Sequence, residues 1–460
     1  MNAPAAPLPV SPAAAIVPAT RILARYIVGS RCDDIPQPVW HEASRALLNW
    51  LGCAIGSCRH ETVARALAAV QPFYGPPQAA VLGRTERMDI LHAALLNGIS
   101  SHVLDFDDTH ARAIHPSAPV LPALLAYAEW RNVSGREFLH AFVLGVEAEE
   151  RIGLSVFPEH YDVGWHITGT AGVFGAAAAA GKLLGLNEQQ IVWALGIAAT
   201  QSAGLREMFG TMCKSFHPGR AAQNGLGAAL LAAADFTSSE QALEAPRGFA
   251  HVTSTRFDPA VITEGLGQRY EILSNMYKPY ACGLVVHAAI DGCIDLVREH
   301  GIRPDQIERV ELTVSPLVPE LTGKRTPQSG LEGKFSVYHA AAAGIVFKAA
   351  GEAQFSDEIV RNPDVVALRD RITAVADASI RKTEAHVTIQ LKSGRRLSRH
   401  VEHALGTLQR PMSDADLETK FRGLVDGVLP RNQADALIAR CWSVAALDDV
   451  AELARLAVPA

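Results

Sequence analysis

The stretch LHAALLNGISSHV, residues 91–103, carries the clearest helical pattern in the chain. Apolar side chains recur there at every fourth position, at Leu91, Leu95, Ile99 and Val103. Residues four apart lie on one face of an α-helix, so this spacing predicts a helix with an apolar stripe. The same periodicity extends from Pro38 to about Leu186. We therefore expect a large helical domain.

Alanine-rich segments continue the helical pattern toward the middle of the chain. One runs from Ala176 to Ala180 after Gly175, and another from Ala228 to Ala234 after Gly227. Small side chains let two helices pack at a short distance between their axes, as helices inside a bundle do. Both segments are therefore expected in the interior, with the two glycines at close helix contacts.

The period of the pattern changes to that of a β-strand near residue 307. Val310, Leu312 and Val314 alternate with polar residues before a proline ends the run, which predicts a strand. Alternation returns at 387–391, and a Ser-Gly turn separates it from 397–401. These two segments predict a β-hairpin.

Helical patterns lie between the predicted strands and after them. Tyr338–Ala349 and Val365–Ala376 are predicted as helices within a small α+β unit, and helices resume after Gly406, including Ala434–Trp442. Because helices flank the α+β unit on both sides, we expect it to be inserted into a discontinuous helical domain.

The sequence thus predicts a mainly α protein, in which a large all-helical domain carries an inserted α+β lid. The expected parts are a flexible N-terminal lead at 1–20, the helical domain at 21–270 and 406–460, and the lid domain at 271–405. The lead contains five prolines and no charged side chain, which is typical of an unfolded segment.

Charge and cysteine content argue against several classes of protein. The formal charge is −6 and no long basic stripe is present, so nucleic acid is not an expected partner. The seven cysteines include no CxxC pair, which argues against a disulfide framework and against a thiolate metal cage. A reducing cytoplasm is the expected location.

Neither a membrane span nor a secretory signal is expected. The uncharged stretch from Gln189 to Leu205 is interrupted by polar residues, whereas a spanning helix needs about 20 mostly apolar residues. The first twenty residues lack the basic region that opens a secretory signal. An organelle transit peptide is the alternative, because Arg21, Arg25 and Arg31 precede the first acid, Asp33.

The densest polar cluster is HVLDFDDTH, residues 102–110, followed by His115-Pro116-Ser117. Its carboxylates and histidines stand at the end of an apolar helix, where they can converge on a pocket. A carboxylate beside a histidine can set the tautomer and pKa of the ring for proton transfer. The competing interpretation is that these residues cap two helices and bond to one another at the surface.

Two metal-dependent interpretations of this cluster are disfavoured. Asp105, Asp107 and Thr109 match the nucleophile loop of haloacid-dehalogenase phosphatases, but that loop follows a parallel strand, and here it follows a helix. Paired aspartates also begin the magnesium sites of helical isoprenoid enzymes, which have a second acidic motif that is not evident here. We expect no metal.

Basic residues gather before both alanine-rich helices. His166 and Thr168 precede the first, and Lys214, His217 and Arg220 precede the second. Free amides at a helix N-terminus and nearby bases suit a substrate that carries carboxylates. An ordinary N-cap and a solvated loop are the simpler alternatives.

Lys278-Pro279-Tyr280 opens the α+β unit. Proline and a following glycine restrict this loop, so Lys278 can be held at the domain junction, a common place for a ligand cleft. For Cys282 a buried structural thiol is favoured over a nucleophile. Tyr338 opens a later helix and points either to the core or into the cleft.

Taken in order, these motifs resemble the MmgE/PrpD family. The resemblance rests on Leu104–His110 with His115-Pro-Ser, Gly164–Gly172, Lys214–Arg220 with Asn224-Gly225, Lys278-Pro-Tyr, Lys334–Tyr338 and Lys420-Phe421, which together span nearly the whole chain. The family contains 2-methylcitrate dehydratases, cis-aconitate decarboxylases and an iminodisuccinate epimerase. Its fold, a large helical domain with an α+β lid, agrees with the pattern above.

The resemblance implies a lyase, a dehydratase without a cofactor, that acts on a 2-methylcitrate-like hydroxy-polycarboxylate by proton transfer at carbon. A cis-aconitate-type decarboxylase and an iminodisuccinate-type epimerase are the alternatives within the family. A non-enzymatic scaffold or binding protein is the alternative from another class, and it predicts a closed domain junction without convergent bases. The resemblance also implies a homodimer and no metal, unlike aconitase with its iron–sulfur cluster.

The resemblance carries residue roles over by motif. The implied catalytic residues are Asp105, His115 and Lys214, and the implied substrate-binding residues are Thr109, His166, Lys278 and Tyr338. His115 is expected to transfer the proton, with Asp105 orienting it or a neighbour. Lys214 and Lys278 are expected to bind carboxylates, and His166 to bind or protonate one.

The chain departs from several relatives in one loop. Those relatives place a His or Arg after the Lys-Pro-Tyr element, whereas residues 281–284 here read ACGL and carry no charge. One carboxylate contact is therefore expected to be missing. A dicarboxylate smaller than methylcitrate or aconitate becomes a candidate substrate.

Overall fold

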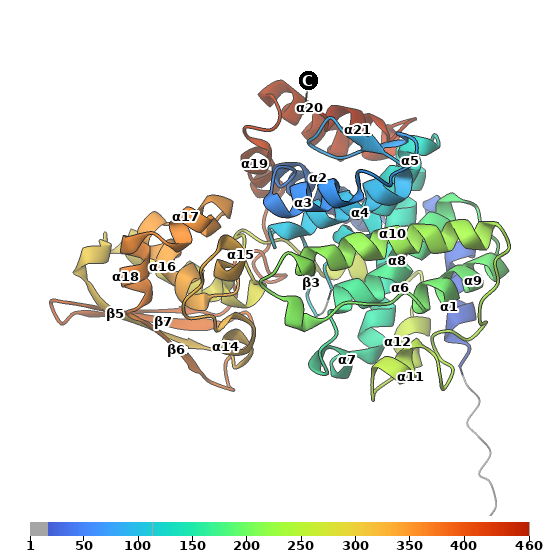
Figure 1. Cartoon of the computed structure of the whole chain (residues 1–460). Coiled ribbons are helices and arrows are strands. Elements are labelled where there is room, and N and C mark those ends of the chain that lie inside the picture. The colour runs from blue at the N-terminus through green and yellow to red at the C-terminus, as the bar shows by residue number, and fades with distance from the viewer. Residues whose placement is uncertain (1–16, 113, 460) are drawn as a thin grey trace, which may run out of the picture.

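The structure is a computed structural model that describes residues 17–112 and 114–459. A large helical domain and a smaller domain built on a β-sheet lie side by side (Figure 1). This arrangement confirms the predicted mainly α fold with an α+β lid. Most of the predicted N-terminal lead, up to residue 16, lies outside the described residues, and the first helix begins at Ala19.

The helices of the larger domain come from both ends of the chain. The N-terminal part holds α1 (Ala19–Gly29), α2 (Gln37–Gly56), α3 (Glu61–Val70), α4 (Ile90–Val103), α5 (Ser117–Trp130), α6 (Gly135–Val156), α7 (Glu159–Asp162), α8 (Ile167–Leu183), α9 (Glu188–Ala199), α10 (Cys213–Ala233), α11 (Phe249–Thr253) and α12 (Pro259–Thr263). The C-terminal part holds α19 (Asp414–Val425), α20 (Arg431–Trp442) and α21 (Glu452–Leu456). The helical domain is discontinuous, as predicted.

Helix α4 lies at the centre of the larger domain. The carboxylate of Asp89 caps it by accepting hydrogen bonds from the amides of Leu91 and His92 at 3.0 and 3.1 Å. The sequence predicted a single apolar stripe, but α2, α5 and α10 surround this helix and bury it on nearly every side. A Cβ on Gly98 would lie 2.5 Å from the Cα of Gly219, so these glycines allow α4 and α10 to cross closely.

Helices α8 and α10 pack together, but one of the two predicted glycine contacts is wrong. A Cβ on Gly175 would lie 2.5 Å from Glu149 Oε2, which is the expected close approach. Among the described residues outside α10, no atom lies within 4 Å of a Cβ on Gly227. The contact falls at Gly225, where a Cβ would lie 2.5 Å from the Cβ of Ala176, because residues two apart point to opposite sides of a helix.

The smaller domain contains a four-stranded sheet in the order β6-β5-β7-β8. Its strands are β5 (Ile307–Val314), β6 (Ile372–Ala376), β7 (Ala385–Leu391) and β8 (Arg396–Val401), and its helices are α13 (His287–Glu299), α14 (Leu317–Thr322), α15 (Gly330–Gly333), α16 (Val337–Phe347), α17 (Asp357–Val360) and α18 (Pro363–Arg369). β7 and β8 form the predicted hairpin, with Gly394 at a φ of 86° in its turn. α13 packs against β7 and β8.

The predicted helix at Val365–Ala376 is too long. Helix α18 ends at Arg369, and Ile372–Ala376 forms β6, which pairs in parallel with β5 from Val310↔Ile372 onward. A short apolar run does not distinguish a strand from a buried helix by periodicity, and here the partner strand lies far away in the chain.

Short β-pairings join loops around the larger domain. β1 (Ala79–Ala80) pairs with β2 (Arg87–Met88), and β3 (Thr109–His110) pairs with β4 (Asn275–Met276). The second pair brings the acidic cluster beside the segment that enters the smaller domain. A single bridge, Trp165↔Leu205, joins the loops before α8 and α10.

Lys420 of α19 connects the C-terminal helices to the domain junction. Its ammonium donates hydrogen bonds to the side-chain oxygen of Asn49 and to the carbonyls of Phe106 and Lys278, at 2.8, 2.6 and 2.9 Å. Burial lowers the pKa of this ammonium to about 8. One side chain thus joins α2, the loop after α4 and the segment that enters the smaller domain.

Helix α6 buries a carboxyl group that has no partner. Glu149 is fully buried, and neither of its carboxyl oxygens has a hydrogen-bond partner among the described residues. Burial, with a smaller contribution from Glu150, raises the pKa of Glu149 well above its ordinary value. The folded protein therefore holds this group in its neutral form.

Replacement of Glu149 by glutamine is expected to stabilise the protein more as the pH rises. A carboxyl whose pKa is raised by folding contributes stability below its unfolded pKa, near 4.3, and that contribution is lost as the pH rises toward the folded pKa. Glutamine has the same shape and does not titrate. Each unit of raised pKa corresponds to about 1.4 kcal/mol, so the melting temperatures of E149Q and wild type should separate progressively between pH 5 and pH 8.

The control for this measurement is E358Q, because Glu358 is exposed on the smaller domain. Its melting temperature should follow that of the wild type at every pH. A constant difference between E149Q and wild type across this pH range would show that Glu149 is not neutral in the folded protein.

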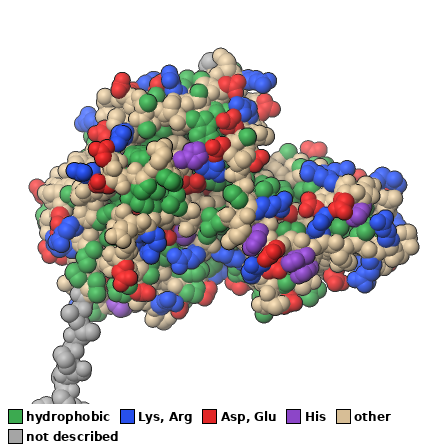
Figure 2. All heavy atoms as spheres, turned by 180° about the vertical axis from the view of Figure 1, so that it is seen from behind, with side chains coloured by type: hydrophobic (Ala, Val, Ile, Leu, Met, Phe, Trp, Pro, Cys, Tyr) green, Lys and Arg blue, Asp and Glu red, His purple; other side chains and the backbone are tan. Residues whose placement is uncertain are grey.

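The surface carries mixed charge. On the face drawn in Figure 2, acidic and basic side chains are interspersed over both domains. Among the described residues, the helices are either too short or too polar to cross a membrane.

Candidate active site

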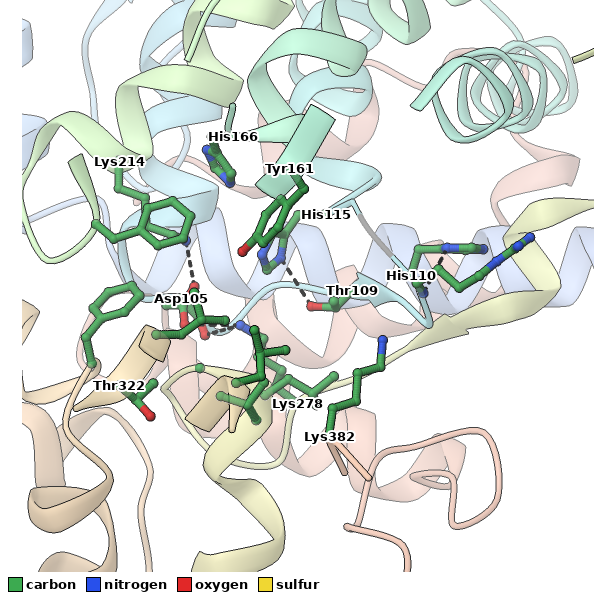
Figure 3. Close-up of a pocket in the computed structure, with 18 of the residues that line it drawn as sticks. Asp105, Thr109, His110, His115, Tyr161, His166, Lys214, Lys278, Thr322 and Lys382 are labelled. Atoms are coloured by element: carbon green, nitrogen blue, oxygen red, sulfur yellow. Dashed lines mark hydrogen bonds and ion pairs between the residues drawn. The ribbon is translucent and has the colours of Figure 1, made fainter. Parts of the chain in front are cut away.

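A cavity of about 230 Å³ lies between the helical domain and the lid domain. The helical domain contributes most of its polar side chains and the lid contributes leucine, valine and phenylalanine (Figure 3). Six of the seven predicted site residues line it, namely Asp105, Thr109, His115, His166, Lys214 and Lys278. The junction is therefore hollow and lined by convergent bases, contrary to what the scaffold alternative predicts.

Tyr338 is the predicted site residue that the structure does not bring to the cavity. Its ring is 7% exposed, packs in the hydrophobic core of the lid, and lies 4.2 Å from the guanidinium of Arg325. The lid side chain of the same motif that lines the cavity is Phe335. The alternative in which Tyr338 points to the core matches this placement.

Asp105 follows α4 in a left-handed backbone conformation, with φ of 50°. Aspartate tolerates this region better than most residues do. Its Oδ1 lies 2.7 Å from Lys214 Nζ and its Oδ2 lies 3.2 Å from Lys278 Nζ. Burial alone would raise the pKa of Asp105, but the two ammonium groups hold it well below its ordinary value. The carboxylate that was expected to orient His115 or a neighbour thus binds both lysines.

The His115 ring is fixed through its Nδ1 atom. Nδ1 lies 2.8 Å from the backbone carbonyl of Asp108, and because a carbonyl only accepts, Nδ1 carries the proton and donates it. Asp107 Oδ2 lies 3.5 Å from the same atom. In this tautomer Nε2 has a free lone pair. Burial lowers the pKa of His115 to about 3, so the ring is neutral and able to act as a base.

Lys214 also belongs to a directional chain of hydrogen bonds. Its ammonium lies 2.8 Å from His102 Nε2, and His102 Nδ1 lies 2.8 Å from Asp107 Oδ2. Since an ammonium only donates and a carboxylate only accepts, Lys214 donates to Nε2 and Nδ1 donates to Asp107. Burial lowers the pKa of Lys214 from its ordinary value, which makes its ammonium a stronger acid.

His102 and Asp107 lie in the acidic motif but were not among the predicted site residues. The structure gives them a positioning role, since His102 bonds Lys214 while Asp107 bonds His102 and lies beside His115. The sequence feature that could have identified them is the spacing of five residues between His102 and Asp107. In the structure the chain turns back after α4, so that Asp107 contacts His102.

His166 lies across the cavity from Asp105, at the N-cap of α8. Its Nδ1 lies 2.9 Å from Nδ1 of His217, so one of these rings donates to the other. Phe209 packs edge-on against it, with 5.0 Å between the ring centres. Burial lowers the pKa of His166 well below its ordinary value, and the nearby Lys214 ammonium lowers it further. The His166 ring is therefore neutral.

The far end of the cavity contains cations that the sequence analysis missed. Arg112 follows the acidic motif, and Lys382 extends from the loop between β6 and β7 (Figure 3). Lys382 Nζ donates to the carbonyl of Ala111 at 2.6 Å. No motif marked Lys382, because it reaches the cavity through the folding of the lid.

Enzymatic activity is expected to survive exhaustive chelation. His102, Asp107 and His115 place possible ligand atoms within 4.8 Å of one another. These atoms already bond to each other or to the backbone, and the Lys214 ammonium 2.8 Å from His102 repels a cation. Turnover should be equal before and after dialysis against EDTA. Loss of turnover that one divalent ion restores would contradict this prediction.

Comparison with known proteins agrees with the motif pattern. The sequence model of the MmgE/PrpD N-terminal domain matches residues 21–262, and that of the MmgE/PrpD C-terminal domain matches residues 280–444. The cis-aconitate decarboxylase of Aspergillus terreus is 27% identical over 92% of this chain and 92% of its own length. The cis-aconitate decarboxylases of Mus musculus and Homo sapiens are each 26% identical, over 95% of this chain and over 93% and 94% of their own lengths. The chain therefore belongs to the MmgE/PrpD family and is an enzyme of the lyase type.

Proposed function

We propose that the protein is a cofactor-independent dehydratase that acts on a 2-methylcitrate-like hydroxy-polycarboxylate by proton transfer at carbon. The observation that carries this proposal is the pairing of a neutral base with an acid across one cavity. His115 presents a free Nε2, and Lys214 presents an ammonium whose pKa burial lowers. Elimination of water needs both groups, since one proton leaves carbon and another joins the departing hydroxyl.

The reaction follows from these positions. His115 Nε2 takes the proton from the carbon next to a carboxylate, and the electron pair of that C–H bond forms the new carbon–carbon double bond. The C–O bond breaks, and Lys214 protonates the hydroxyl, which leaves as water. Solvent then removes the proton from His115 and returns one to Lys214.

Lys278 supports this reaction by binding the carboxylate next to the reacting carbon. The Asp105 carboxylate neutralises one of the two lysine charges. Asp105, Lys214 and Lys278 together therefore carry a net charge of +1. That positive charge matches one carboxylate, which it holds beside the reacting carbon.

Decarboxylation is the second candidate. It is favoured by the similarity to cis-aconitate decarboxylases over nearly the whole chain. It is also favoured by the uncharged lid loop, where Gly283, Leu284 and Val285 line the cavity. A carboxylate that leaves as carbon dioxide loses its charge, and an apolar wall favours that loss.

One experiment separates these reactions. The protein is incubated in deuterated water with citrate, 2-methylcitrate, cis-aconitate or iminodisuccinate, and the products are identified by NMR. A dehydratase yields an alkene from a hydroxy acid, whereas a decarboxylase yields a product one carbon shorter with deuterium at carbon. Exchange with inversion and without loss of a group would identify an epimerase and contradict the proposal.

Lys278→Met is expected to raise the KM for the substrate by about tenfold to a hundredfold with a smaller change in kcat. Hydrogen bonds to charged groups contribute roughly 1.5–3 kcal/mol, and methionine removes the charge while keeping the length of the side chain. Steady-state kinetics measure the effect. Lys392→Met, in the exposed turn after β7, is the control and should behave as wild type. An unchanged KM would remove Lys278 from the substrate-binding site.

A further inference from the structure

Lys382 is a largely buried cation at the far end of the cavity. Its loop, between β6 and β7, reaches from the lid to the helical domain, where Nζ donates to the carbonyl of Ala111 at 2.6 Å. In Figure 3 its amine points up toward the side of the cavity where His110 lies. Lys382 is thus a lid residue whose ammonium contacts a wall of the helical domain at one end of the cavity.

The described residues do not provide a counter-ion for Lys382. Burial lowers the pKa of its ammonium, Arg112 lowers it further, and no carboxylate contributes to the shift. Arg112 is little better paired, since Glu271 Oε2 lies 4.0 Å from its guanidinium and the side chain is 59% exposed. Burying a charge without a partner is unfavourable, so two adjacent cations in a cavity favour a bound anion.

The rest of the cavity leaves this end as the place for a second carboxylate. Lys214 and Lys278 share Asp105 and together match one carboxylate. The lid loop presents the uncharged side chains of Leu284 and Val285 to the cavity. An anionic group placed against these side chains would lose its hydration without gaining a partner.

We propose that Lys382 and Arg112 form a second carboxylate-binding subsite, which makes the enzyme selective for acids whose carboxylates reach both ends of the cavity. The first carboxylate binds at Lys278 and the second at Lys382. This inference rests on the proposed function, because it assumes that the substrate is a polycarboxylate. Beyond that function, the inference assigns Lys382 and Arg112 as the residues that distinguish a dicarboxylate from a monocarboxylate.

The test compares the binding of glutarate and pentanoate by calorimetry. These unreactive acids share a five-carbon chain, and glutarate has the second carboxylate. The wild type should bind glutarate about tenfold to a hundredfold more tightly than pentanoate, because one hydrogen bond to a charged group changes affinity by about that factor. Lys382→Met should reduce this ratio to near one, while Lys382→Arg should retain most of it. Lys392→Met is the control and should keep the wild-type ratio.

Three results would overturn the subsite. An unchanged ratio in Lys382→Met would show that the lysine does not bind the second carboxylate. An equal loss of affinity for both acids would show that Lys382 holds the lid instead. Equal affinities of the wild type for pentanoate and glutarate would show that no second subsite exists. If the wild type binds neither acid, carboxylate recognition itself fails, and the proposed function fails with it.

Discussion

His115→Ala is expected to lower kcat by about a hundredfold to ten-thousandfold, the usual contribution of general acid–base catalysis, with little change in substrate affinity. The Asp108 carbonyl holds the proton on Nδ1, so Nε2 is the atom that accepts a proton from carbon. Pro116 follows this residue and restricts its backbone to an extended conformation, which helps to fix the ring. Steady-state kinetics at saturating substrate concentration measure this fall in kcat directly.

A thermal melt of the same variant provides the control. His115 is 13% exposed at the side chain and faces the cavity, so its removal should leave the melting temperature close to that of the wild type. A variant that melts far lower and keeps normal turnover per folded molecule would show that His115 packs and does not catalyse. His166 would then become the leading candidate for the base.

Lys214→Ala is the second substitution with a large expected effect, a fall in kcat of about a hundredfold or more. The variant loses the acid that protonates the leaving hydroxyl. It also leaves His102 Nε2 without its donor and Asp105 with one lysine. Steady-state kinetics with and without added methylammonium test this role. A small amine that enters the space left by the lysine side chain can supply the missing proton, so it should restore part of kcat.

Rescue by the amine distinguishes an acid from a binding residue. If KM rises while kcat stays at the wild-type value, Lys214 binds a carboxylate and does not transfer a proton. Lys392→Ala, in an exposed turn of the smaller domain, should show neither the loss nor the rescue.

The fold was predictable where a local pattern specifies it. The alternation at Val310–Val314 and the hairpin turn near Gly394 are local features, and both appear in the structure. Strand β6 was missed because its parallel pairing with β5 is a tertiary contact. The close helix contact at Gly225 was assigned to Gly227 because the sequence does not show which face of α10 meets α8.

The site residues were predictable from the sequence where several of them lie in one motif. Asp105, Thr109 and His115 lie in a single loop. Lys214 and Lys278 were separate candidates from their own segments, and the family resemblance joined them to this loop. The lysine partners of Asp105 and its left-handed backbone are tertiary features that the local sequence does not show. Lys382 could not be found, because nothing near it in sequence has a functional pattern.

The hydrogen bonds of Lys420 have a consequence for the synthesis of the protein. This lysine holds the carbonyls of Phe106 and Lys278 together, and it is added to the growing chain 315 residues after Asp105. At 5–20 residues per second, the ribosome needs on the order of 15–60 s to make the intervening polypeptide. Once Lys214 has been added, the nascent chain carries its base and its acid but lacks the residue that joins the two segments, so the domain junction is completed only when Lys420 has been made.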